Sequence, residues 1–171
     1  LEEPAAEMAA LAILATEPPE GDDLVVASLR YLEAIDSSGL GPLARKLVDH
    51  DKSAVAGTAV RVLKKDPAAG ELLLAKLRDD RVPAELKPDM ILVLGELRYA
   101  LAYDDLAAIV DDRSQEKIWR MYAAESLGRL ADPRAIPLLR GLFAEDDALL
   151  RAHAASALGR FDEPGVSEVL E

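Results

Sequence analysis

Apolar and polar positions follow a helical period along most of the chain. In the segment 119–130 one apolar stripe is formed by Trp119, Ala123, Ser126, Leu127 and Leu130. The spacing i, i+4, i+7, i+8, i+11 is typical of a helix that buries one face. The same stripe returns 31 residues later, over Leu150–Phe161. A pattern that recurs at a fixed distance predicts stacked helical units, because each unit needs its neighbours to bury that face.

Five copies of this helix are predicted. The apolar position that Leu127 occupies recurs at Leu29, Val60, Leu94, Leu127 and Leu158, with spacings of 31, 34, 33 and 31 residues. Each interval has room for two helices and two turns, which is an αα-hairpin. We therefore expect an all-α fold of five helix pairs, roughly eleven helices in all. The five residues are expected to line one continuous core, with Trp119 buried beside the last two.

The whole chain, 1–171, is predicted to form a single repeat domain. A capping helix falls within 1–21, and the repeats follow at approximately 22–50, 51–79, 80–112, 113–144 and 145–171. In the third repeat Pro88 predicts a restart or kink of the helix. The last helix, Val166 to Leu170, is short and covers the fifth repeat poorly. We expect further repeats beyond Glu171, or self-association or another chain at that end.

Glycine recurs at one position of the predicted helices. Gly128 and Gly159 each follow the core leucine, and each lowers helix propensity by about 1 kcal/mol relative to alanine. Their recurrence suggests that close packing of neighbouring helices compensates for this cost.

At these residues the chain resembles a known repeat class. The segments 119–137 and 150–161 are similar to the HEAT-like repeats of the phycobilisome-lyase type, whose unit runs Val-Arg-x-x-Ala-Ala-x-Ala-Leu-Gly. The resemblance is close over 114–171 and weaker over 22–113. It implies a right-handed α-α superhelix, a HEAT-like solenoid, used mainly to hold other proteins. It also implies that Arg120 pairs with acids of Asp111–Asp112, and Arg151 with acids of Glu145–Asp147.

Composition and charge narrow the classes of function. The net charge is −12, and residues 1–36 carry nine acidic residues against the single base Arg30. An acidic chain repels phosphate backbones, so no nucleic-acid partner is expected.

The chain has no cysteine, which excludes disulfides and thiolate chemistry. No apolar run approaches the roughly 18 residues of a membrane span. The compartment stays open between the cytoplasm and the mature form of an exported protein.

No pattern of residues predicts a catalytic, cofactor or metal site. Gly39–Ala44 fits the dinucleotide fingerprint as a string, but a helix precedes it where that site requires a strand. HEAT-like hydroxylases that bind two irons use repeated His-Glu pairs. Here His50 and His153 are the two histidines, and neither is followed by glutamate. Paired aspartates fall at turns and helix starts, where aspartate caps helices. The sequence therefore predicts a protein that is not an enzyme.

A binding surface is predicted on the concave side, which these repeat helices line by resemblance. The residues not used for packing are Ile118, Met121, Tyr122 and Glu125 in the fourth repeat, Leu149, Ala152, His153 and Ser156 in the fifth, and Asp89 and Leu92 in the third. Tyr122 and His153 are equivalents, 31 residues apart, and are expected side by side. A patch of apolar side chains with polar groups among them is typical of protein-binding surfaces. The alternative is that the curvature of the stack covers these side chains.

The function predicted from the sequence is a non-enzymatic protein–protein interaction scaffold. It would bind a protein or peptide on the concave face of the solenoid. Two alternatives remain: a bilin lyase or isomerase-like subunit, as the repeat class suggests, and a structural spacer within a longer repeat protein.

Overall fold

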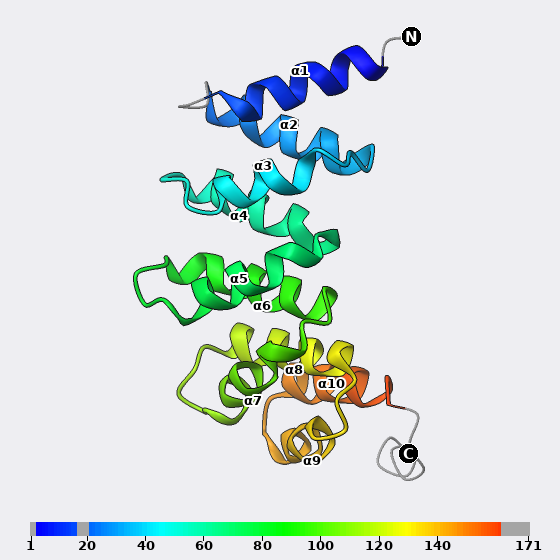
Figure 1. Ribbon diagram of the computed structural model, residues 1–171. Helices are drawn as coiled ribbons and strands as arrows, with labels where there is room; N and C mark the ends of the chain where they lie inside the picture. Colours follow the sequence, from blue (N-terminus) through cyan, green and yellow to red (C-terminus); the bar gives the residue numbers. More distant parts are fainter. Residues whose placement is uncertain (1–2, 17–20, 162–171) are drawn as a thin grey trace. The chain divides into compact units, whose positions relative to one another are not determined.

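Ten α-helices make up the part of the chain that the structure describes, residues 3–16 and 21–161. A computed structural model (Figure 1) contains no strand over these residues. The helices are α1 (Glu3–Ala15), α2 (Asp22–Ala34), α3 (Leu40–Leu47), α4 (Ser53–Val62), α5 (Gly70–Arg78), α6 (Lys87–Glu96), α7 (Tyr103–Asp111), α8 (Lys117–Leu130), α9 (Ala135–Gly141) and α10 (Ala148–Leu158). Short 3₁₀ turns lie at Leu63–Lys65, Pro67–Ala69, Ala84–Leu86, Ala100–Ala102 and Leu142–Ala144. The all-α class is confirmed, whereas the helix predicted at Val166–Leu170 lies outside the described residues.

The chain divides into two compact units. Unit 1 is Leu1–Asp89 and unit 2 is Met90–Glu171. In unit 1, α1 packs against α2 and α3, and α4 packs against the same two helices. In unit 2, α8 packs against α7 and α10, and α9 contacts α7, α8 and α10. Within each unit, therefore, helices pack mainly on neighbours in the chain, as stacked hairpins do. The boundaries of the five repeats remain a prediction.

The equivalent apolar residues lie in the cores of the two units. Leu29 and Val60 in unit 1, and Leu94, Leu127 and Leu158 in unit 2, have no exposed surface. Burying a side chain of this size stabilises the fold by about 1.5–3 kcal/mol. Trp119 is only half-buried, so its predicted burial is wrong. Trp119 stands in the first turn of α8, and the end of a helix has fewer neighbours to cover a large ring.

Two glycines let neighbouring helices of unit 2 approach closely. A Cβ added to Gly128 would lie 2.7 Å from the Cα of Ala157, and one added to Gly95 would lie 2.5 Å from the Cβ of Ser126. Neither distance leaves room for a carbon atom. The predicted compensation by packing is confirmed for Gly128. Gly159 differs, because the nearest atoms to such a Cβ, at 3.5 Å or more, belong to its own helix.

The buried arginine of α8 has a different partner from the one the resemblance implies. Arg120 is 8% exposed; its Nε donates to the carbonyl of Val110 and its Nη2 to Oε1 of Glu145, both at 3.0 Å. Asp112, in the segment that the resemblance indicates, accepts the amide and the hydroxyl of Ser114. Arg151 does reach the predicted segment, but it donates to the backbone carbonyl of Glu145 at 2.7 Å.

The start of α6 agrees with the restart expected at Pro88. The 3₁₀ turn Ala84–Leu86 precedes it, and α6 begins at Lys87. Pro88 thus falls in the first turn of α6. Backbone N–H groups there have no partner within the helix, so the N–H that proline lacks costs no hydrogen bond.

Candidate functional site

The side of α8 that faces away from the core carries one stripe of surface residues. Ile118, Tyr122, Glu125 and Arg129 follow the spacing i, i+4, i+7, i+11, so they share one face of the helix. Ile118 is 36% exposed, and the other three are half-buried. The rest of α8 is largely covered because several helices of unit 2 pack around it.

The same stripe recurs on α10, which packs against α8 in Figure 1. Leu149 is 59% exposed, Ala152 and Ser156 are exposed, and His153 is half-buried. Leu149 is the equivalent of Ile118, so each helix presents an exposed aliphatic side chain near its start. The carboxylate of Asp147 caps α10 by accepting the amides of Leu149 and Leu150, and it also pairs with Lys117 of α8.

The end of α6 completes this surface. Leu92 is half-buried and Glu96 is exposed. We call the combined surface the unit 2 face; it comprises Leu92 and Glu96 of α6, Ile118, Tyr122, Glu125 and Arg129 of α8, and Leu149, Ala152, His153 and Ser156 of α10.

Two predicted surface residues do not contribute to the unit 2 face. Met121 is 8% exposed and therefore belongs to the core. It precedes Gly128 by seven residues, so it lies on the side of α8 that packs against α10. Asp89 belongs to unit 1, where its carboxylate accepts Nη1 of Arg61 at 2.5 Å.

A connected set of charges crosses the unit 2 face. Arg129 reaches Glu96 through Nη1 at 2.9 Å and Glu125 through Nη2 at 2.8 Å. The second oxygen of Glu125 lies 3.7 Å from Nδ1 of His153. Burial acts to lower the pKa of Arg129, but the hydrogen bonds and charges of Glu96 and Glu125 outweigh it and raise that pKa above its usual value. This network links α6, α8 and α10 side by side.

Sequence reasoning did not find Glu96 and Arg129. Two signals were available: Arg129 stands four residues after Glu125, which is the spacing of a helical ion pair, and Glu96 is the equivalent of Arg129 in α6.

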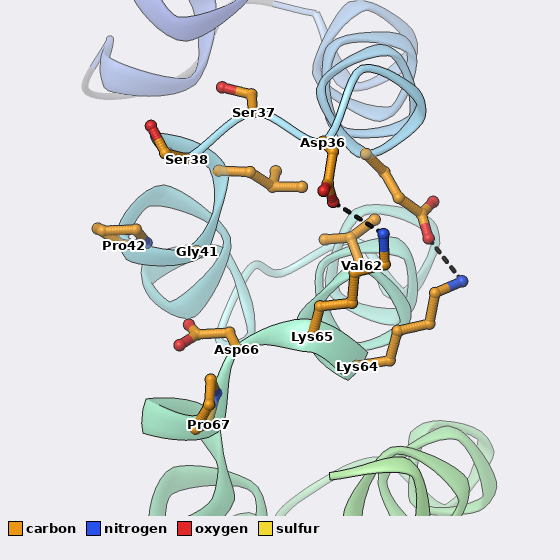
Figure 2. Close-up of a pocket in the computed structure, with 12 residues that line it drawn as sticks. Asp36, Ser37, Ser38, Gly41, Pro42, Val62, Lys64, Lys65, Asp66 and Pro67 are labelled. Carbon is orange, nitrogen blue, oxygen red and sulfur yellow. Dashed lines mark hydrogen bonds and ion pairs between the residues drawn. The ribbon is translucent and has the colours of Figure 1, made fainter.

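Unit 1 contains a polar cleft of about 400 Å³ between the turns that follow α2 and α4 (Figure 2). Lys65 pairs with Asp36 at 2.8 Å, and Lys64 pairs with Glu33 at 2.7 Å. The cleft's lysines are thus neutralised by its own carboxylates, which leaves little charge to select a ligand. Leu40, Gly41 and Pro42 of the fingerprint-like string line the cleft at the start of α3, and α2 precedes the string.

Over 3–16 and 21–161, no three side chains of His, Asp or Glu gather as a metal site requires. No helix in these ranges is long and apolar enough to cross a membrane.

Comparison with known proteins gives two likenesses. Residues 103–171 match the family described as HEAT repeats. The chain is also similar to deoxyhypusine hydroxylase of Candida albicans, with 34% identity over 91 residues. That alignment covers 50% of this chain and 29% of the enzyme, so the chain spans less than a third of this relative's length. The family match and the stacked helices support a HEAT-like repeat protein.

Proposed function

We propose that this chain is a non-enzymatic scaffold that binds a protein or peptide partner on the unit 2 face. One observation carries the proposal: Ile118 and Leu149, 36% and 59% exposed, stand at equivalent positions of two packed helices. Tyr122 and His153 lie one turn further along and supply polar groups. Exposed apolar side chains that gather on one surface mark interaction sites, and tyrosine is enriched among the residues that anchor protein interfaces.

The charge network supports this role by fixing the surface before a partner arrives. Arg129 pairs with both Glu96 and Glu125. These three side chains therefore lose less conformational freedom on binding than three unpaired side chains would. The backbone contact of Gly128 with Ala157 restrains the relative position of α8 and α10 in the same way. Repeat proteins use stacked helix pairs of this kind to bind extended partners.

An enzymatic function is a second candidate, because the partial relative is a hydroxylase. The residues give it little support: His50 pairs with Asp51 in unit 1, and His153 lies near Glu125 in unit 2. The narrower likeness to repeats of the phycobilisome-lyase type suggests a bilin lyase-like subunit, which uptake of a bilin pigment would reveal. A spacer role predicts no partner for the unit 2 face.

The test is selection of peptides from a displayed library on the whole chain, followed by affinity measurements with purified variants. Leu149→Ser and Tyr122→Ala should each weaken binding by about 1–2 kcal/mol, roughly 5- to 30-fold. Leu101→Ser is the matched control, since Leu101 is 70% exposed in a turn before α7, away from the unit 2 face. Circular dichroism of each variant must match that of the parent. Equal losses for Leu101→Ser and Leu149→Ser would contradict the proposal, and unfolding of Tyr122→Ala would assign Tyr122 to the core.

A further inference from the structure

Unit 1 carries an apolar groove between its first two helices. The groove has a volume of about 300 Å³ and is lined by Ala6, Ala9, Ala10 and Ile13 of α1 and by Ala27, Ser28 and Tyr31 of α2. Apart from the hydroxyls of Ser28 and Tyr31, all of these side chains are apolar. The space exists because alanine side chains are too short to fill the gap between two helices.

Exposed aliphatic side chains stand near the start of α2 and directly after its end. Leu24 is 49% exposed and Ile35 is 38% exposed. With Ala27 and Tyr31 they follow the spacing i, i+3, i+7, i+11, so they form one stripe on the groove side of the helix. A stripe of this length that remains open to solvent is typical of an interaction surface.

We propose that this groove binds an amphipathic helix of a partner protein, with aliphatic side chains on one face and lysine or arginine beside them. The alanine floor requires an occupant that brings the larger side chains, and leucine or isoleucine at helical spacing fits between the two rows. Ala6 to Ile13 spans about 10 Å of helix axis, enough for about two turns of the occupant.

The charge around the groove determines the sign of the occupant. Asp22 and Asp23 are exposed at the start of α2, directly before Leu24. Two carboxylates exceed the partial positive charge of about half a unit at the start of α2. A basic partner is therefore attracted and an acidic one repelled.

Other occupants fit this charge less well. A second copy would bring the same acidic surface against itself. The segment 162–171 carries four acids and no base, so it would be repelled as well. The groove belongs to unit 1 and shares no residue with the unit 2 face, and the two proposals therefore fail independently.

The experiment uses the full chain, labelled with ¹⁵N, and a synthetic 14-residue peptide with leucines on one helical face and lysines on the other. We expect amide shifts confined to α1 and α2. A peptide with glutamate in place of each lysine should bind at least about tenfold more weakly, and added salt should weaken the lysine peptide's binding.

Matched variants separate groove binding from general attraction. Ala9→Gln fills the groove with a polar chain, whereas Ala12→Gln makes the same change at an exposed alanine outside the groove lining. Glutamine and alanine differ little in helix propensity, so both variants should fold. Ala9→Gln should weaken the lysine peptide by about tenfold and Ala12→Gln by less than about twofold. Asp22→Asn with Asp23→Asn should reduce the salt dependence.

Three results would overturn the inference. These are shifts spread over the acidic surface without preference for α1 and α2, equal losses for the two glutamine variants, and a concentration-dependent dimer that Ala9→Gln abolishes. The last result would identify a second copy as the occupant of the groove.

Discussion

Neighbouring helices meet in two different ways in this chain. In unit 2, α8 and α10 come into backbone contact, because Gly128 presents no side chain to Ala157. In unit 1, Ser28 of α2 stands at the position equivalent to Ala157, and with Ala10 of α1 it lines a groove, although both side chains are largely buried. The glycine of α8 thus gives a closed helix contact, whereas the alanines of α1 leave a surface that can accept a partner.

The outward chemistry differs between the same two regions. Tyr122, Glu125 and Arg129 of α8 correspond to Leu24, Ala27 and Tyr31 of α2. The long charged residues of α8 pair with one another and cover their surface, whereas the short or apolar residues of α2 leave theirs open.

The largest effect is expected at Arg120, which unit 1 replaces by Asp22 and Ser53 at the equivalent positions. Arg120→Ala removes the donor to the Val110 carbonyl and the buried partner of Glu145. The free energy of unfolding should fall by about 2–4 kcal/mol in urea denaturation. Arg113→Ala is the control: Arg113 also pairs with Glu145 but is 74% exposed, so the loss should stay below about 1 kcal/mol. Similar losses for both would mean that burial of Arg120 matters little.

The glycine contact should give the next largest effect. Gly128→Ala places a Cβ 2.7 Å from the Cα of Ala157, which forces α8 and α10 apart. Despite the better helix propensity of alanine, the free energy of unfolding should fall by about 1–3 kcal/mol. Gly141→Ala is the matched change, because nothing lies within 4 Å of its added Cβ, and it should be neutral or slightly stabilising. A stable Gly128→Ala variant would show that the close approach is not needed.

Acid should affect the two units unequally. In unit 1, hydrogen bonds from the side chain and backbone of Arg81 lower the pKa of Asp79 to about 2. In unit 2, hydrogen bonds from neighbouring residues lower the pKa of four carboxylates, Asp112, Asp132, Glu145 and Asp147. A lowered pKa in the folded state stabilises the fold above the unfolded pKa of about 4, and this stability is lost as the pH falls toward the folded value.

Unit 2 should therefore begin to unfold at a higher pH than unit 1 between about pH 4 and 2. Trp119 fluorescence reports on unit 2, since Trp119 is the chain's single tryptophan, and its transition should precede the loss of helix seen by circular dichroism. Asp132→Asn keeps an acceptor for the Arg134 amide but cannot be protonated, so its transition should move to lower pH. The predicted difference between the units is wrong if the fluorescence and circular dichroism transitions coincide and Asp132→Asn does not shift them.

Much of the fold follows from periodicity, because a buried stripe at helical spacing has few other solutions. Leu127 and Leu158 are found where the repeat predicts them. The errors concern residues whose surroundings depend on neighbouring helices. Met121 looks like a surface residue in a single-helix pattern, yet α10 covers its side of α8. Arg120 pairs with Glu145 of the following repeat, a contact that the spacing within one repeat does not indicate.

The surfaces were less predictable than the cores. The exposure of Ile118 and Leu149 agrees with the sequence pattern, whereas their role in binding remains a prediction. The network through Arg129 depends on lateral distances between helices, which spacing along the chain does not specify. The groove of unit 1 was missed because a row of alanines indicates close packing equally well. The sequence alone cannot say that Ala9 and Ala10 border open space.

The smallest effect is expected at Glu125, where α2 has Ala27. Glu125→Ala removes one partner of Arg129 but leaves Glu96, so the loss of stability should be about 0.5 kcal/mol. A double-mutant cycle with Arg129→Met should give a coupling energy of about 0.3–0.5 kcal/mol that decreases in salt. The variant should gain no affinity for the leucine–lysine peptide. The backbones of α8 and α10 touch at Gly128, so a shorter side chain at Glu125 should leave no groove between them. Binding of that peptide to α8 and α10 of Glu125→Ala would contradict this. It would show that the outward side chains, and not the contact at Gly128, determine where a groove forms.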